Sequence, residues 1–270
     1  MTQESKSKIL YITQEIDPYL NINGIGALIQ KLPSFAQQSG MEIRILMPRF
    51  GTINERRHRL HEVVRLSGMN IIIDDDDFAL IIKVASLPGS RIQVYFLDNN
   101  EFFKRKFVFE DEGGKPFEDN QDRMIFFCKG AIETVRKFGW PPDLVHCHGW
   151  MTSLIPFYLK TVYKNDPVFK HSKVIFSIYD NEYQDSFSES FFQKAAINNL
   201  KKEQLQIFNS DNGIILEKGV IQFADGIIQG SEELAENLRL AIEESKKPFI
   251  DTPKENYLPN YIDFYKTFLS

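Results

Sequence analysis

The chain alternates between short apolar runs and longer stretches in which apolar residues recur at helical spacing. Lys8 to Gln14 is an apolar run with polar flanks, and Gly24 to Ser39 carries its apolar residues on one helical face. A second apolar run, Glu42 to Met47, follows closely. This order of strand, loop, helix and strand predicts a βαβ unit with two parallel strands.

The same order recurs in the second half of the chain. Apolar patterning predicts helices over Gln121 to Phe138, Thr152 to Tyr163, Gly219 to Ala224 and Glu232 to Glu243, and strands over Leu144 to His146, Lys173 to Ile178 and Gly226 to Gln229. We therefore expect an α/β fold with a Rossmann-like, doubly wound and mostly parallel sheet.

One stretch departs from this order and predicts an inserted antiparallel meander. Its strand-like runs are separated by turn residues and cover Val63 to Leu66, Asn70 to Ile73, Phe78 to Ala85 and Ile92 to Leu97. The acidic run Asp74 to Asp77 lies between two of them. A solvated hairpin turn is a better interpretation of this run than a metal site, because four adjacent carboxylates repel one another and rarely converge.

The composition changes near residue 245, so we expect a domain over residues 1–245 and a tail over residues 246–270. Prolines forbid a continuous helix before Asn260, but the last ten residues can form one. An apolar face on that helix is expected to dock on the domain or on a partner; it would consist of Tyr261, Phe264, Tyr265, Phe268 and Leu269.

The composition of the whole chain narrows the classes of partner. With 270 residues, of which 43% are hydrophobic and 26% charged, the chain resembles an ordinary soluble globule. A formal charge of -5 argues against nucleic-acid or anionic-membrane partners, which require dense positive charge. The polar N-terminus lacks a signal-peptide pattern, and no apolar stretch approaches the roughly 20 residues that span a bilayer. We expect a cytoplasmic protein.

The two cysteines, Cys128 and Cys147, fall in different predicted elements without Cys-x-x-Cys spacing. Neither a disulfide framework nor a structural zinc site is therefore indicated, and reduced thiols are expected. Cys128 is expected to pack beside Phe126 and Phe127 as a small apolar residue.

The strongest candidate for chemistry is the His-rich turn at the end of the strand that begins near Leu144. Ligands of parallel sheets gather at the carboxyl ends of the strands, so His146, His148 and Trp150 are expected to face a substrate. Two hydrogen-bonded imidazoles in a cleft or core are a better interpretation of the histidines than a metal pair, because no third ligand lies nearby. Trp150 could stack on a sugar or pack at the helix start.

A second candidate is Gly24-Ile25-Gly26 at the start of the first helix. Such glycines let backbone amides approach a phosphate, but they can equally serve only to turn the chain. Both interpretations stay open on the sequence.

Several segments resemble the N-terminal domain of bacterial glycogen and starch synthases, which are retaining glucosyltransferases of two-domain GT-B architecture. The resemblance rests on Lys8 to Tyr19, Leu32-Pro33, Gly40 to Arg49, Val94 to Asp98, Asp119 to Arg123 and Asp143 to Trp150. It implies a single domain equivalent to half of a GT-B enzyme. In the family, this domain takes part in glucose transfer from ADP-glucose to an α-1,4-glucan.

The resemblance also names candidate ligand-binding positions, without any cofactor or metal. They are Glu15, Asn21, Gly24, Gly26, Asp119, Asn120, Arg123, His148, Trp150, Met151, Tyr183 and Gln184. Glu15, Asp119, Asn120 and Arg123 could each instead be a helix cap or part of a structural ion pair.

The departures from the family pattern bear on catalysis. Asn21 stands where the family has a Lys beside the diphosphate, and Met151 stands where it has a His expected to contact glucose. Gly149 replaces an Asp, and a further His near Tyr179 is lost. No span matches the family's second domain, which provides most of the nucleotide site, although the terminal segment looks like the family's final helix.

Three hypotheses follow, with the catalytic residues unassigned. The first is a degenerate domain that binds an α-glucan, a sugar nucleotide or sugar phosphate, or a protein partner, without autonomous turnover. The second is an active glucosyltransferase completed by a partner chain or by a homo-oligomer at the face where the second domain would sit. The third is an unrelated small-substrate enzyme on the same fold.

Overall fold

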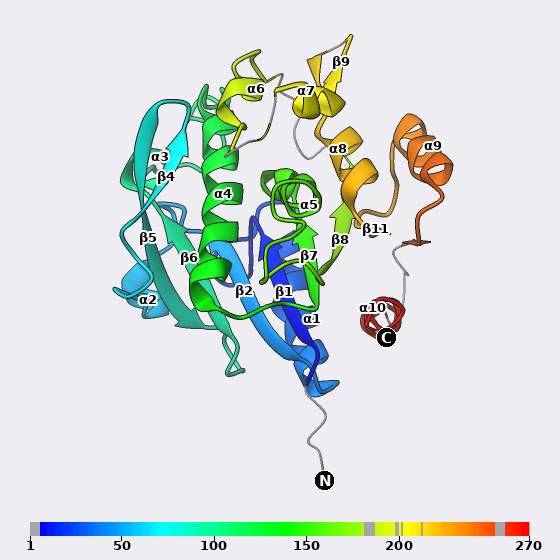
Figure 1. Cartoon of the computed structure of the whole chain (residues 1–270). Helices are drawn as coiled ribbons and strands as arrows, with labels where there is room; N and C mark the ends of the chain where they lie inside the picture. The colour runs from blue at the N-terminus through cyan, green and yellow to red at the C-terminus, as the bar shows by residue number, and fades with distance from the viewer. Residues whose placement is uncertain are drawn as a thin grey trace.

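The computed structural model describes residues 6–180, 187–197, 200, 202–211, 213–251 and 257–269 (Figure 1). Its centre is a ten-stranded sheet with the order β12-β11-β8-β7-β1-β2-β6-β5-β3, in which β4 also pairs with β5. The parallel strands are β1 (Lys8–Thr13), β2 (Glu42–Pro48), β6 (Gln93–Asp98), β7 (Leu144–His148), β8 (Lys173–Ile178), β11 (Gly226–Gln229) and β12 (Phe249–Ile250). The predicted mostly parallel sheet is confirmed.

Helices cover both faces of this sheet, as a doubly wound fold requires. They are α1 (Ile25–Gln38), α2 (Glu55–His58), α3 (Asn100–Phe103), α4 (Asn120–Phe138), α5 (Leu154–Lys160), α6 (Phe191–Lys194), α7 (Lys202–Leu205), α8 (Leu216–Phe223), α9 (Glu236–Ser245) and α10 (Tyr257–Lys266), with 3-10 turns η1 (Trp150–Thr152) and η2 (Gln206–Phe208).

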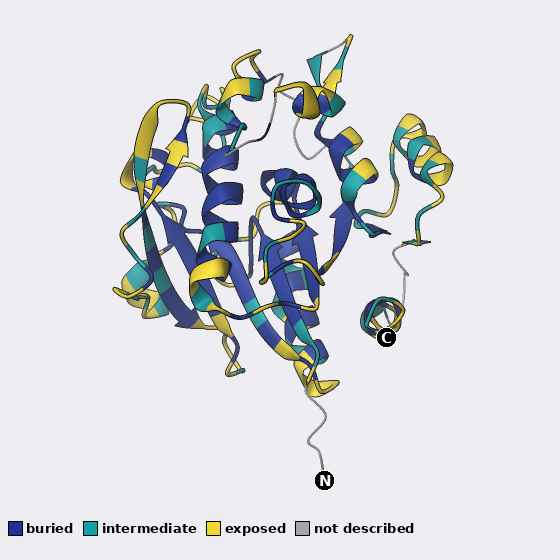
Figure 2. Cartoon of the chain, in the orientation of Figure 1, coloured by how far each residue is buried: buried dark blue, intermediate teal, exposed yellow. Residues whose placement is uncertain are grey.

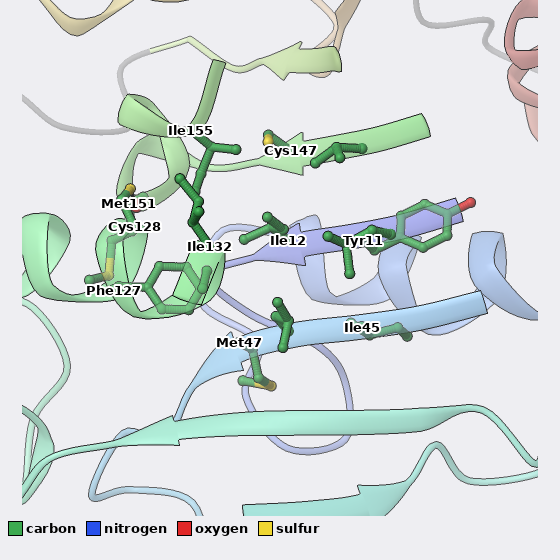
Figure 3. Close-up of a cluster of buried hydrophobic side chains, with 14 of the residues drawn as sticks. Tyr11, Ile12, Ile45, Met47, Phe127, Cys128, Ile132, Cys147, Met151 and Ile155 are labelled. Carbon is green, nitrogen blue, oxygen red and sulfur yellow. Dashed lines mark hydrogen bonds between the residues drawn. The ribbon is translucent and has the colours of Figure 1, made fainter. Parts of the chain in front are cut away.

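The alternation of side chains along β7 shows which helices cover which face. Cys147 lies on the face covered by α4 and α5, where Figure 3 places it near Ile155 and the cluster around Cys128. His146 points to the opposite face and contacts Tyr265 of α10. Because α10 also contacts α1, these two helices share that second face. Figure 2 shows the central strands buried and α9 mostly exposed.

The meander differs from the prediction in two places. It consists of β3 (His61–Glu62), β4 (Met69–Ile73) and β5 (Asp76–Ser86), and β5 is antiparallel to β6. The run Val63 to Leu66 is a turn rather than a strand, since the Leu66 amide donates to the Val63 carbonyl at 2.9 Å. The run Ile92 to Leu97 contributes β6, which also pairs in parallel with β2 and so belongs to the main sheet.

The acidic run forms the predicted hairpin turn. Ile73 of β4 pairs with Asp76 of β5, so Asp74 and Asp75 make the two-residue connection. Asp74 has a φ of 57°, a left-handed conformation that Asp tolerates in tight turns. A separate small hairpin joins β9 (Asn209–Ser210) to β10 (Gly213–Ile214).

Helix α10 packs closely against strands β1, β7 and β11 of the sheet. Tyr261 and Tyr265 are fully buried, and Tyr265 hydroxyl contacts His146 Nδ1 at 2.6 Å. A Cβ atom added at Gly226 would lie 2.6 Å from Phe268 and 3.0 Å from Phe264. Gly226 is therefore the residue that lets the helix approach this strand. Of the helices that the structure describes, none has the length and apolarity needed to cross a membrane.

The close approach at Gly226 makes a first prediction. Gly226→Ala should lower the free energy of unfolding by about 1–3 kcal/mol, because the methyl group overlaps two aromatic rings. Urea denaturation measures this loss. Gly113→Ala is the matched control, since an added Cβ there meets only the Asp111 side chain at 3.3 Å. Equal stability of the two variants would contradict close packing of α10.

Candidate functional site

The predicted site residues lie on segments that follow the carboxyl ends of β1, β6 and β7. These ends share one edge of the sheet because the three strands are parallel. The segments are the loop between β1 and α1, the loop and helix start between β6 and α4, and the turn η1 after β7. The candidate positions Tyr183 and Gln184 lie outside the described residues.

In the loop after β1, the backbone amides donate to side chains of the same loop. The Glu15 carboxylate accepts hydrogen bonds from the amides of Ile22 and Asn23, the latter at 3.2 Å. The Asn21 side-chain oxygen accepts one from the Gly24 amide, also at 3.2 Å. The Ala27 amide bonds the Gly24 carbonyl within the first turn of α1. These donors therefore already have partners within the chain.

Two opposing effects act on the pKa of Glu15. Burial raises the pKa of this carboxyl, because a charge loses hydration inside the protein. Hydrogen bonding from the amides of Ile22, Asn23, Gly26 and Ile25 opposes the rise, since it favours the ionised form. The carboxylate thus occupies the position at the start of α1 where the helix dipole favours an anion.

The two glycines of this loop serve its own geometry. Gly24 precedes α1 with a φ of 83°, a left-handed conformation that favours glycine. A Cβ at Gly26 would lie 2.8 Å from the Leu20 carbonyl oxygen and 3.0 Å from the Asp17 amide nitrogen. Gly26 is therefore required for a close approach within the chain, which is the turn interpretation of the Gly24-Ile25-Gly26 pattern.

At the start of α4, the candidate Asp119 forms an ion pair. Arg105 donates to both of its carboxylate oxygens, with one distance of 2.7 Å. The side chains are 26% exposed for Arg105 and 30% for Asp119, so both remain in contact with solvent. Asp119 precedes α4 but its side chain does not cap the helix.

Asn120 and Arg123, one turn apart on α4, are buried and tie the preceding loop to the helix. Arg123 donates to the Asn120 side chain at 2.6 Å and to the Phe102 carbonyl at 2.8 Å. Asn120 donates to the Phe109 carbonyl at 2.7 Å. The Arg123 guanidinium also lies about 5.5 Å from the centres of three phenylalanine rings, those of Phe50, Phe103 and Phe117. The contacts favour the structural alternative for both residues.

The two histidines of β7 are buried and hydrogen-bonded. His146 contacts Tyr265 through Nδ1 and Ser177 through Nε2, the latter at 2.9 Å, and His148 contacts the Tyr179 hydroxyl through Nδ1 at 2.9 Å. Burial lowers the pKa of both rings, that of His148 to about 3, so both are neutral near pH 7. Within the described ranges, no three His, Cys, Asp or Glu side chains converge as metal ligands.

Trp150 and Met151 follow β7 in the turn η1 and are buried as well. Trp150 packs between Phe109 and Phe187, with ring centres 5.0 and 6.2 Å away. Met151 lies in the core cluster shown in Figure 3, where the Cys128 thiol donates to its carbonyl at 3.1 Å. His146, His148 and Trp150 are buried, with 0%, 0% and 4% of their surfaces exposed, and the expectation that they face a substrate stays a prediction. Cys128 packs in the core as expected.

Sequence reasoning missed Gln14, which lies opposite Gly149. Gly149 has φ 87° and ψ 154°, a region nearly restricted to glycine. A Cβ at this position would overlap the Gln14 side chain. The side-chain oxygen of Gln14 accepts a hydrogen bond from the Met151 backbone amide at 3.4 Å. The backbone amide of Gln14 donates to the His148 carbonyl at 3.3 Å. The sequence offered one signal of this contact, the Gly149 that replaces the family's Asp. That replacement alone does not indicate which side chain lies opposite Gly149.

Residues 8–244 match the profile of the family described as Starch synthase catalytic domain. The chain belongs to this family. The chain is 36% identical over 241 residues to a glycogen synthase of Chlorobium phaeobacteroides, covering 88% of the chain and 48% of that relative. A glycogen synthase of Pelodictyon phaeoclathratiforme is 39% identical over 188 residues, or 69% of the chain and 38% of the relative. The chain spans about half the length of the curated relatives it matches.

A solved structure shows the same fold. The chain superposes on the catalytic domain of starch synthase IV from Arabidopsis thaliana, bound to ADP and acarbose, with a TM-score of 0.77 and 21% identity. The match covers 92% of this chain and 51% of that one. The fold predicted from the resemblance, one half of a GT-B enzyme, is confirmed.

The pairing of Gln14 with Gly149 makes a second prediction. Gly149→Ala should lower the free energy of unfolding by about 2 kcal/mol or more, from backbone strain and from overlap with Gln14. In a Gln14→Ala background the same change should cost about 1 kcal/mol less, because the overlap is gone. Urea denaturation of the four proteins of this double-mutant cycle provides the measurement, and additive costs would show that the two positions are not coupled.

Proposed function

We propose that this chain is a glycogen-synthase-type domain that binds α-glucan at the carboxyl edge of its sheet and does not transfer glucose from ADP-glucose by itself. The family match and the glycogen synthase relatives support the glycogen-synthase type. The ADP and acarbose in the Arabidopsis structure support a nucleotide and an oligosaccharide as the ligands to consider. This chain's own residues argue against autonomous transfer.

The observation that carries the proposal is the state of the loop before α1. A diphosphate binds at a helix start through backbone amides that lack other partners. Here the amides of Ile22 and Asn23 donate to Glu15, and the Gly24 amide donates to Asn21. A diphosphate would have to displace these bonds next to a carboxylate. Asn21 also supplies no positive charge where the family has a Lys, so ADP-glucose should bind weakly.

Met151 supports the same conclusion for the sugar. The resemblance assigns this position to a His that contacts the transferred glucose, but the Met151 side chain is fully buried in the core. A thioether offers only a weak acceptor and no donor to a hydroxyl group. Stabilisation of charge in the transition state usually supplies the largest part of catalysis. The chain therefore lacks two of the contacts expected to stabilise transfer.

Exposed groups on the same edge suit a neutral glucan. Phe107, in the loop after β6, is 40% exposed, and Ile22, in the loop after β1, is 42% exposed. Aromatic and apolar side chains of this kind can pack on the apolar face of a sugar ring. The partly exposed pair Arg105 and Asp119 lies in the same β6 to α4 loop and can hydrogen-bond hydroxyl groups. A neutral polymer also escapes repulsion from the net charge of -5.

Two measurements test the proposal together. Calorimetry with maltoheptaose should detect binding, and Phe107→Ala should weaken it about fivefold, or about 1 kcal/mol, through loss of ring stacking. Val64→Ala removes a side chain from a residue that is 79% exposed on the meander and should leave binding unchanged. Incubation with radiolabelled ADP-glucose and glycogen should give no incorporation above a control without protein. Absence of binding heat, or steady incorporation by the chain alone, would overturn the proposal.

The state of the loop gives a sharper prediction. Asn21→Lys should raise the affinity for ADP about tenfold, because it frees the Gly24 amide and adds a charge-assisted hydrogen bond. Asn23→Lys adds the same charge to the same loop without freeing that amide, and should raise the affinity much less. Calorimetry with ADP compares the two variants with the natural chain. Tight ADP binding by the natural chain would show that the loop bonds do not exclude a diphosphate.

A further inference from the structure

A buried lysine on α4 joins three segments of the chain. Lys129 is 3% exposed, and its ammonium donates to the backbone carbonyl of Ile72 in β4 at 2.9 Å. It also donates to the carbonyls of Lys194 and Ala196, both at 2.8 Å. The last two belong to residues 187–197, which we name the strap. All three protons of the ammonium therefore bond main-chain oxygens of elements other than its own helix.

Other side chains of α4 and α5 hold the strap in the same place. Gln121 accepts from the Ser188 amide at 2.9 Å, and Asp122 forms an ion pair of 2.6 Å with Lys194. The Tyr158 hydroxyl donates to the Ala195 carbonyl at 2.6 Å. Lys129 differs from these contacts because it alone among them links the strap to β4.

The strap also borders the candidate site. Its first residue, Phe187, packs against Trp150, and Phe187 stacks on Phe191 of α6 with ring centres 5.8 Å apart. Trp150 stands in the turn η1 at the carboxyl end of β7. The position of the strap therefore determines what lies beside Trp150.

The surroundings of the ammonium contain room and few opposite charges. A cavity of about 500 Å³ lies beside Lys129 and is lined by β4, by α4 and by Gln193, Ala196 and Ile197. The charged groups that face it are Asp74 of the hairpin and Glu133 and Arg136 of α4. Glu133 bonds Arg136 at 2.8 Å and the Tyr163 hydroxyl at 2.8 Å, and Asp74 bonds Gln193. Among the described residues, no carboxylate forms an ion pair with Lys129.

We propose that Lys129 is a positioning residue, whose bonds to the strap and to β4 fix Phe187 against Trp150 and so shape the glucan site. The part concerning glucan rests on the function proposed above, whereas the part concerning Trp150 does not. Without the Lys129 ammonium, these three carbonyls would lack donors inside the protein. A buried carbonyl without a donor costs more free energy than one exposed to water. A side chain of similar length without donors should therefore release the strap.

The titration of Lys129 gives a readout that packing alone would not produce. Burial lowers the pKa of this ammonium to about 8, since a charge loses hydration inside the protein. A released strap exposes Lys129 to water and returns its pKa toward the ordinary value of about 10.4, so the released state binds more protons above pH 8. Rising pH between about 8 and 10 should therefore hold the strap more tightly, because the neutral amine keeps two of its three donors and no longer carries a buried charge.

The experiment compares Lys129→Met with Lys137→Met. Lys137 lies on the same helix and donates to the carbonyls of Leu66 and Ser67 at 3.4 Å, away from the strap. In a Trp140→Phe background, where Trp150 is the remaining tryptophan, Lys129→Met should raise acrylamide quenching of fluorescence at least twofold. Amide exchange over residues 191–197 should rise about tenfold. Lys137→Met should change neither quantity.

The remaining outcomes separate the parts of the proposal. Exchange of the strap, corrected for the intrinsic pH effect, should slow from pH 8 to 10 in the natural chain and stay constant in Lys129→Arg, whose charge persists. The adjoining cavity has room for the guanidinium.

Maltoheptaose affinity should fall about threefold or more in Lys129→Met. Unchanged quenching in this variant would overturn the positioning role, and a loosened strap with unchanged glucan affinity would overturn its place in the glucan site. Failure of the natural chain to bind glucan overturns the proposed function and leaves the fluorescence result to decide the rest.

Discussion

The structure depends on covering both faces of a mostly parallel sheet. Strand β1 contains three consecutive residues that are fully buried, Ile9, Leu10 and Tyr11. Because consecutive side chains point to opposite faces, neither face of this strand meets water. Helices α4 and α5 cover one face and α1 and α10 cover the other. The need to cover the second face explains why α10 carries fully buried tyrosines. It also explains why β11 begins with Gly226, which faces the phenylalanine rings of this C-terminal segment.

The same covering determines what the strand end can do. Most polar groups that the family pattern associates with a ligand are here bonded within the chain. The Asn21 oxygen accepts from an amide, Asn120 and Arg123 bond each other and carbonyls, and His148 Nδ1 bonds a hydroxyl group, whereas His148 Nε2 is buried without a partner in the part of the chain that the structure describes. A buried polar group without a partner is costly, so each substitution that removes a ligand contact favours an internal replacement. The Gln14 side chain occupies the space beside Gly149 that any side chain at position 149 would need.

Local pattern predicted some of these features well and others poorly. The strand from Lys8 and the helix from Gly24 were readable because their periods are set by neighbouring residues. The run Val63 to Leu66 was not, since a four-residue run with three apolar residues fits a turn as well as a strand until the pairing with β5 is known. His148 and Trp150 lie at a strand end as predicted. Their positions in the sequence do not indicate that aromatic rings pack against them, those of Phe109 and Phe187 on Trp150 and that of Tyr179 on His148. Lys129 gave no signal at all, because its partners come from β4 and the strap.

Periodicity and short motifs were enough to predict the order of the elements, the mostly parallel sheet and the family, because they depend on residues close together in the chain. Which polar groups remain available to a ligand became known only from the packed fold. The reason is that a hydrogen-bond partner can come from any distance along the chain, as Gln14 and Met151 show across 137 positions. Whether a donor is used internally is therefore a property of the packed molecule, and a motif records only that the donor is present.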